Sequence, residues 1–145
     1  MGSQKYNIMV TSEQLKELVK RQETLGKHLN VEAMTMQAQE EEEKTQMPDF
    51  WDDAKKAEAI LKQIKIKKTW IDSFQEVVTA VDDVKVLFDF YAEGEAEESD
   101  VESAYKLAFT TLEDLEFKNM LDSEEDQLNC VMEINPGAGG TESQD

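Results

Sequence analysis

The chain has 145 residues, room for one domain of ordinary size, and its 33 acidic and 15 basic residues give it a net charge of −18. This charge argues against autonomous nucleic-acid binding, in which Lys and Arg must displace counterions from phosphates, so DNA is not an expected partner. The single cysteine, Cys130, rules out an intrachain disulfide, and no apolar run approaches the ~20 residues needed to cross a bilayer. We therefore expect a cytoplasmic protein without a membrane partner.

Residues 1–10 show no clear periodicity and are predicted to be a disordered tail. Thr11 can cap the first helix, with Gln14 three residues later in the capping-box position. The helix is predicted to run through the acidic residues Glu40–Glu43 and to end at Met47, because the residue before proline is disfavoured in the α region. Apolar residues at three- and four-residue steps support this helix: Leu15, Leu18, Val19, Leu25, Leu29, Ala33 and Met36.

A turn follows the first helix, with the sequence Pro-Asp-Phe-Trp-Asp-Asp at residues 48–53. Asp49 or Asp52 is expected to cap the next helix. Two adjacent exposed rings would form an unusual apolar patch, so we expect Phe50 and Trp51 to be largely buried at one end of a helical bundle. Trp51→Ala would then cost about 3–5 kcal/mol.

The second helix is the longest, predicted from about Asp52 to Ala92 and ended by Gly94 as the residue after its C-cap. A helix of about forty residues would be roughly 60 Å long, which suggests an antiparallel coiled coil with the first helix. Its apolar period is carried by Ala57, Ile60, Leu61, Ile64, Ile71, Phe74, Val77, Val78, Val81, Val84, Leu87, Phe88 and Tyr91.

The third helix is predicted to begin at a capping box of Ser99 and Glu102 and to reach about Leu121. An acidic hinge, residues 123–126, then leads into a strand-like run at residues 128–134 and a glycine turn. A single strand leaves its backbone groups unpaired, so this strand needs partner strands that the chain does not supply. The predicted fold is all-α: an elongated three-helix bundle or coiled-coil-like domain over residues 11–122. Residues 123–145 would be the hinge and the start of a truncated central domain, a C-terminal β-strand stub.

No set of residues predicts catalytic, cofactor-binding or metal-binding chemistry. The glycine turn, Gly137 to Thr141, lacks the lysine of a phosphate-binding P-loop, and a tight turn is the simpler interpretation. His28 and Glu32 are one helical turn apart, but a single histidine without a nearby cysteine favours an exposed helix pair over a metal site. Trp51, Trp70 and Cys130 are interpreted as core side chains.

A basic cluster on the long helix is the best candidate for a phosphate-facing surface. The alternative is a solvated helix face that balances acidic neighbours. The cluster consists of Lys55, Lys56, Lys62, Lys65, Lys67 and Lys68.

Two short motifs resemble the bacterial class I peptide chain release factors, and most closely the peptide chain release factor 2 subfamily. One is the turn Pro48, Asp49, Phe50, Trp51, which resembles the Pro-Asp-x-Trp element of the subfamily. The other is the glycine turn with Gly137, Gly139, Gly140 and Thr141, which continues to Gln144 and Asp145. The connecting segment at residues 115–121 is also similar, so the resemblance covers about residues 11–145.

The resemblance implies that the intact protein directs peptidyl-tRNA hydrolysis on the ribosome at UGA and UAA. The family uses a Ser-Pro-Phe tripeptide and a Gly-Gly-Gln loop for this, and neither occurs in this sequence. The chain would then be a non-catalytic N-terminal docking domain, not an enzyme, without cofactors. Its implied partners are the stalk-base region of the large ribosomal subunit, with ribosomal RNA and proteins, and peptide chain release factor 3. The alternative hypotheses are a generic helical coiled-coil adaptor unrelated to termination and, less favoured, a nucleotide-binding fragment.

Overall fold

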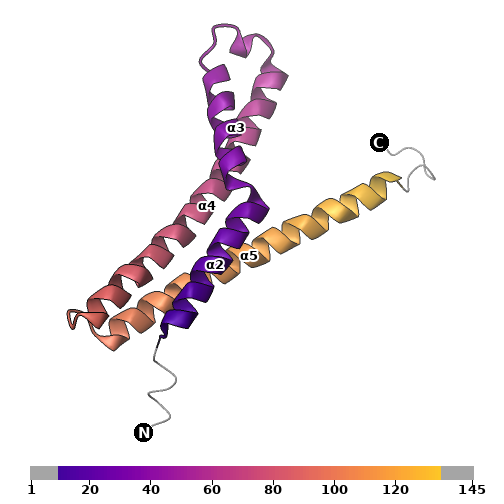
Figure 1. Ribbon diagram of the computed structural model, residues 1–145. Coiled ribbons are helices and arrows are strands. Elements are labelled where there is room, and N and C mark those ends of the chain that lie inside the picture. The colour runs from indigo at the N-terminus through magenta and orange to yellow at the C-terminus, as the bar shows by residue number, and fades with distance from the viewer. Residues whose placement is uncertain (1–9, 135–145) are drawn as a thin grey trace. The chain divides into compact units, whose positions relative to one another are not determined.

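The structure is a computed structural model that describes residues 10–134, and its secondary structure elements over that range are all helices joined by turns (Figure 1). Its elements are α2 (Ser12–Leu29), α3 (Val31–Lys44), the short 3₁₀ helix η1 (Phe50–Asp52), α4 (Ala54–Ala92) and α5 (Glu98–Ile134). The chain divides into two compact units, residues 1–112 and 113–145. The predicted all-α fold class is confirmed.

The predicted start of the first helix is confirmed in atomic detail. Thr11 Oγ1 accepts a hydrogen bond from the Gln14 backbone N–H at 3.0 Å, and Gln14 Oε1 accepts one from the Thr11 backbone N–H at 2.9 Å. This reciprocal capping box satisfies two backbone donors that a helix start would otherwise leave without partners.

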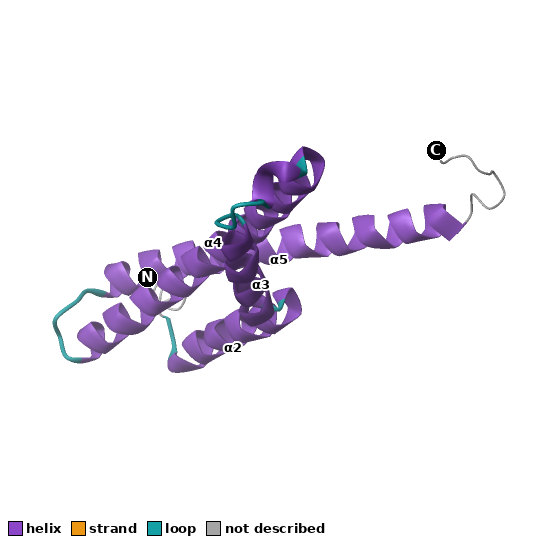
Figure 2. Ribbon diagram, turned by 90° about the horizontal axis from the view of Figure 1, so that it is seen from above, coloured by secondary structure: helices purple, strands orange, loops and turns teal. Residues whose placement is uncertain are grey.

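The first helix is not continuous, contrary to the sequence prediction. Asn30 lies between α2 and α3 in the left-handed conformation, with φ 58° and ψ 50°. Asparagine tolerates this region better than most residues, and its backbone N–H still donates to Lys27 O at 3.1 Å. The apolar spacing continues across Asn30, which is why periodicity alone suggested one helix. Both α2 and α3 pack along α4 (Figures 1 and 2).

The long helix is confirmed, with a small shift of its start. α4 has 39 residues, about 58 Å at the usual rise per residue. Its N-cap is Asp53, whose Oδ1 accepts the Lys56 N–H at 3.1 Å, and not the expected Asp49 or Asp52. The helix ends as predicted: Gly94, two residues after Ala92, has φ +80°, a conformation that costs glycine little.

The core of the first unit is built from small and medium aliphatic side chains of α2, α3, α4 and the first part of α5. Leu18, Leu112, Val77, Val81 and Val84 are fully buried. Burying each such side chain contributes about 1.5–3 kcal/mol relative to leaving it exposed. Further core residues are Leu25, Leu29, Ala38, Ala57, Ile64, Ala80, Val101 and Ala108.

The last helix differs from the prediction at both ends. At its start, Asp100 Oδ2 accepts the Glu97 backbone N–H at 3.0 Å, so Ser99 is not the cap. Further on, α5 continues to Ile134, through the expected hinge at residues 123–126 and the expected strand at residues 128–134. A helix satisfies its backbone groups within one segment, whereas a lone strand cannot. The glycine turn and residues 1–9 of the expected tail lie outside the described residues, whereas Val10 is buried.

Candidate interaction surfaces

Two of the six candidate lysines on α4 are ion-paired with the acidic segment of α3. Lys67 Nζ lies 2.8 Å from Glu41 Oε2, and the two side chains are only 17% and 22% exposed. Lys68 pairs with Glu42 at a more exposed position, and the hydrogen bond to Glu42 raises the pKa of Lys68 above its ordinary value. These two lysines fit the alternative interpretation, in which the cluster balances acidic neighbours.

The other four lysines are exposed and have no ion pair within the part of the chain that the structure describes. They lie within the first twelve residues of α4, the end of the helix that follows the turn from α3. Free ammonium groups on one helix can contact phosphates or acidic surfaces without first losing an internal partner. These residues, Lys55, Lys56, Lys62 and Lys65, therefore remain candidates for a docking surface.

The hairpin tip, residues 45–53 between α3 and α4, carries the Pro-Asp-Phe-Trp motif. Phe50 and Trp51 pack edge to face with ring centroids 4.9 Å apart. Phe50 is half-buried, but Trp51 is 62% exposed, so the predicted burial of Trp51 is wrong. Among the described residues of the first unit, α3 and α4 are the only long helices that meet at this end (Figure 1), and two helices leave one side of the turn uncovered. Pro48 and Asp49 are exposed beside Trp51.

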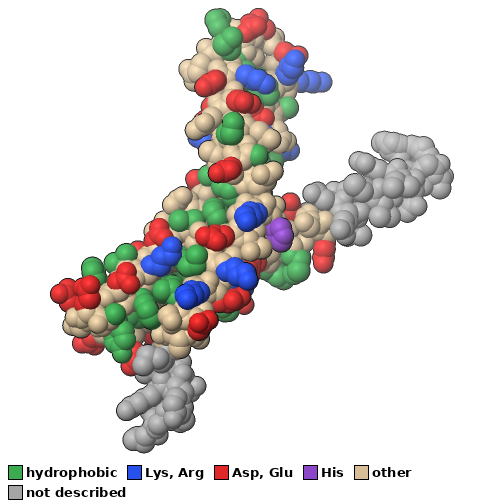
Figure 3. All heavy atoms as spheres, viewed as in Figure 1, with side chains coloured by type: hydrophobic (Ala, Val, Ile, Leu, Met, Phe, Trp, Pro, Cys, Tyr) green, Lys and Arg blue, Asp and Glu red, His purple; other side chains and the backbone are tan. Residues whose placement is uncertain are grey.

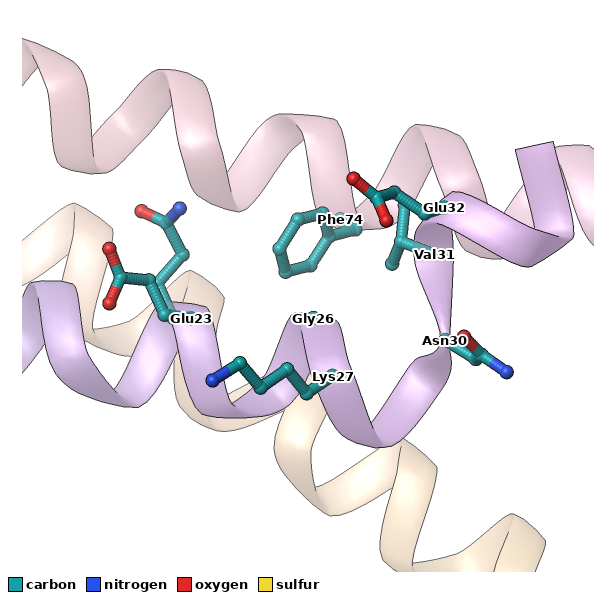
Figure 4. A pocket seen from close by; sticks show the side chains of 8 residues that line it. Glu23, Gly26, Lys27, Asn30, Val31, Glu32 and Phe74 are labelled. Atoms are coloured by element: carbon teal, nitrogen blue, oxygen red, sulfur yellow. The ribbon is translucent and has the colours of Figure 1, made fainter. Parts of the chain in front are cut away.

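A hollow of about 490 Å³ lies where α2 ends at Asn30 (Figure 4). Gly26 has no side chain, and the ring of Phe74 from α4 lies over it. Glu23, Lys27 and Glu32 surround this opening with charges of both signs, so the hollow does not select an anion or a cation. The remaining lining residues are Gln22, Asn30 and Val31.

An acidic groove of about 630 Å³ lies on the surface between α4 and the first part of α5. The sequence alone did not predict this groove. Asp72, Glu76 and Asp83 line it from α4, while Leu107, a largely exposed side chain, lines it from α5. The spacing of these carboxylates, four and seven residues, places them along one helix face, which is the signal that could have revealed the groove. Such a surface suits a basic partner.

The described residues contain no group of three or more potential metal ligands. His28 is exposed, and the break at Asn30 places Glu32 on the next helix, so these two residues do not share a continuous helix face. None of the described helices has a stretch long and apolar enough to cross a bilayer. Across the visible face in Figure 3, acidic side chains are spread over several elements, with basic ones among them.

Comparison with known families decides which protein class this architecture represents. Residues 34–145 match the PCRF domain, a range that begins in α3 and contains the hairpin tip, α4 and α5. The chain belongs to the PCRF domain family. The four free lysines and the exposed Trp51 thus lie inside the PCRF domain match, whereas α2 precedes it.

Relatives of this PCRF domain protein include several proteins named peptide chain release factor 2. The one from a Nitratiruptor species is 37% identical over 140 residues, covering 92% of this chain and 37% of the relative. That from Nautilia profundicola is 34% identical over 140 residues, covering 92% of this chain and 37% of the relative. That from Aeromonas hydrophila subsp. hydrophila is 32% identical over 133 residues, covering 90% of this chain and 36% of the relative.

These similarities confirm the predicted resemblance to class I release factors of the factor 2 type. The chain spans little more than a third of the length of the curated relatives it matches. No solved structure matches this PCRF domain protein.

Proposed function

We propose that this chain is the N-terminal docking domain of a release factor that acts in translation termination in the cytoplasm. The observation that carries the proposal is the match of 92% of the chain to peptide chain release factor 2, confined to 37% of that relative. The whole protein would promote peptidyl-tRNA hydrolysis on the ribosome at UGA or UAA. The domain itself would be non-catalytic, because the family's Ser-Pro-Phe and Gly-Gly-Gln elements do not occur in this sequence.

The proposed partners follow from the surfaces of the domain. The free lysines of α4 suit ribosomal RNA, and the acidic faces suit basic ribosomal proteins near the stalk base of the large subunit. Peptide chain release factor 3 is a further candidate partner. A single domain of a multidomain protein binds weakly, because it loses the effective concentration that linked modules provide.

The first test separates docking from catalysis. The purified chain is added to ribosomes that carry peptidyl-tRNA and a UGA codon in the A site. We expect no release by the chain alone, and a slower release when excess chain competes with the complete peptide chain release factor 2 of Nitratiruptor. Stop-codon-dependent release by the chain would contradict its non-catalytic role. An unchanged release rate in the competition, with no chain bound in a ribosome pelleting assay, would contradict docking.

The second test asks whether the lysines of α4 contribute to docking. The triple variant Lys55→Glu, Lys62→Glu, Lys65→Glu should bind ribosomes more weakly than the wild type, most clearly at low salt. The difference should shrink as salt screens the charges.

A matched control carries the same charge change elsewhere, with Lys16→Glu, Lys20→Glu and Lys106→Glu at exposed positions on α2 and α5. This control separates the location of the charges from the net charge of the domain. Equal losses of affinity in the two triple variants would assign the α4 lysines to a solvated face.

A further inference from the structure

The hairpin tip presents two large apolar side chains to solvent. Trp51 is 62% exposed and Met47, four residues earlier, is 57% exposed. Tryptophan is the side chain most enriched among residues that dominate binding energy, and methionine adapts its shape to apolar pockets. In Figure 3 the tip, at the top of the view, carries apolar side chains among acidic and basic ones. Single exposed apolar residues are common on protein surfaces, so exposure by itself does not mark a binding site.

The backbone around Trp51 is held by local hydrogen bonds. The Phe50 N–H donates to Met47 O at 3.1 Å, and the Asp52 N–H donates to Asp49 O at 3.1 Å. The edge-to-face contact with Phe50 supports one side of the Trp51 ring. A side chain that is fixed before binding loses less conformational entropy when a partner covers it. The tip therefore presents Trp51 in an orientation that is already set.

The charges beside the ring indicate which class of partner it suits. Asp49 and Asp52 flank the two aromatic residues directly in sequence, are exposed, and form no ion pair within the described chain. Residues 43–58 contain five acidic and three basic side chains. A nucleobase stacked on Trp51 would bring its phosphates close to these carboxylates, whereas a basic protein surface would be attracted to them. The charges favour a protein partner.

We propose that Trp51, together with Met47, is an anchor that inserts into an apolar pocket with a basic rim on a protein partner. The proposal rests on the docking function proposed above and names the residues that make the contact. Asp49 and Asp52 would pair with the basic rim, while Trp51 would fill the pocket. Of the free lysines of α4, Lys62 and Lys65 lie beyond residues 43–58, whereas Lys55 and Lys56 are two of the three basic side chains counted in that segment.

Ribosome binding by the whole 145-residue chain tests the anchor. Trp51→Ala should raise the Kd for purified bacterial ribosomes about thirtyfold, the size of a strong interface anchor, and Trp51→Phe should retain most of the affinity. Met36→Ala is the matched control, because Met36 is 61% exposed but lies on α3 away from the tip. Far-UV circular dichroism should be unchanged in all three variants, since none removes a buried side chain. Urea unfolding should show at most a small loss of stability for Trp51→Ala, which removes the edge-to-face contact with Phe50.

Charge variants distinguish a protein partner from RNA. Asp49→Lys with Asp52→Lys should weaken binding to a basic rim. Tighter binding by this variant would indicate phosphate contacts and would overturn the proposal.

Photo-crosslinking identifies the molecule that touches the ring. With p-benzoylphenylalanine at position 51, an adduct to a ribosomal protein is expected. An adduct to ribosomal RNA or to a second copy of the chain would overturn the proposal.

Ribosome binding by the wild-type chain distinguishes failure of the Trp51 anchor from failure of the proposed docking function. Ribosome binding that Trp51→Ala leaves unchanged would overturn the anchor and leave the docking function standing. No ribosome binding by the wild-type chain would overturn both.

Discussion

Gly26 on α2 and Phe74 on α4 touch so closely that a side chain at position 26 would have to displace the Phe74 ring. A Cβ built on Gly26 would lie 2.8 Å from Cζ of the Phe74 ring, below any ordinary carbon contact. The glycine sits one turn before Asn30, where the first helical segment ends (Figure 4). Glycine in a helix interior lowers the stability of the helix relative to alanine. At position 26 the close packing of the Phe74 ring offsets this loss.

We expect Gly26→Ala to destabilise the domain by about 1 kcal/mol, because the clash with Phe74 exceeds the gain in helix propensity. In a Phe74→Ala background the same change should instead stabilise by about 0.5–1 kcal/mol, since only the propensity gain remains. Urea unfolding of the two single variants and the double variant measures this change of sign. If Gly26→Ala stabilises both backgrounds equally, the contact does not constrain position 26.

The two ion pairs between α3 and α4 should differ in their contribution to stability. Glu41 and Lys67 are mostly covered, and Glu41 Oε1 is buried without a hydrogen-bond partner within the described residues. Lys67→Met would leave this carboxylate unpaired in a covered position, at a cost of about 1–3 kcal/mol. Lys68→Met, at an exposed pair, should leave the free energy of unfolding nearly unchanged, because solvent screens the charges.

Each of these two variants is the control for the other, because each replaces one α4 lysine with a side chain of similar length. Chemical denaturation at low and high salt provides the measurement. Equal losses for Lys67→Met and Lys68→Met would show that coverage does not set the strength of these pairs.

The left-handed conformation of Asn30 predicts an unusual order of substitutions. Asn30→Gly should leave stability nearly unchanged, because glycine adopts φ 58° without strain. Asn30→Ala should cost about 1–2 kcal/mol, although alanine is the better helix former, because its Cβ is strained in this region. Thermal unfolding of the two variants decides the order. A more stable Asn30→Ala variant would indicate that α2 and α3 merge into one helix at little cost.

Tyr105 on α5 provides a prediction about pH. Burial raises the pKa of its phenol above the ordinary tyrosine value, while the charge of Arg21 opposes this shift and that of Glu17 adds to it. A folded-state pKa above the unfolded value means that the stabilisation is complete below the unfolded pKa and is lost as pH rises through the folded pKa. The domain should therefore lose stability in the alkaline range where the phenol ionises.

Phenolate absorbance measures this directly, with Tyr105→Phe subtracted to isolate one ring. Arg21→Gln should raise the pKa of Tyr105 further, because it removes the opposing charge, and Glu17→Gln should lower it. If neither variant changes the pKa of Tyr105, the charges of Arg21 and Glu17 on α2 have no effect on the ionisation of the phenol.

Several features could be predicted from the sequence because they depend on interactions within a few residues. The capping box of Thr11 and Gln14 and the termination at Gly94 are local hydrogen-bond and backbone effects. The unbroken apolar period of α4 predicts the helix directly, because each backbone hydrogen bond of an α-helix joins residues only four positions apart. The resemblance to release factors likewise depended on short motifs, and the family match confirms it.

The two wrong predictions of secondary structure, a continuous first helix and a strand at residues 128–134, also have local causes. Asn30 interrupts a helix without interrupting its apolar spacing, so periodicity could not reveal the break. The apolar run at residues 128–134 suits either a strand or a helix, and short runs of this kind do not distinguish the two.

What the sequence determined by itself is the helical class, the long helix α4, the strong negative charge and the family motifs. Only the tertiary structure decided which side chains are covered. Trp51 is exposed because, among the described residues of the first unit, no long helix besides α3 and α4 reaches the hairpin tip. Lys67 is covered because Glu41 lies opposite it on α3. Local periodicity describes one helix at a time, whereas burial and ion pairing depend on which other helices reach the same place.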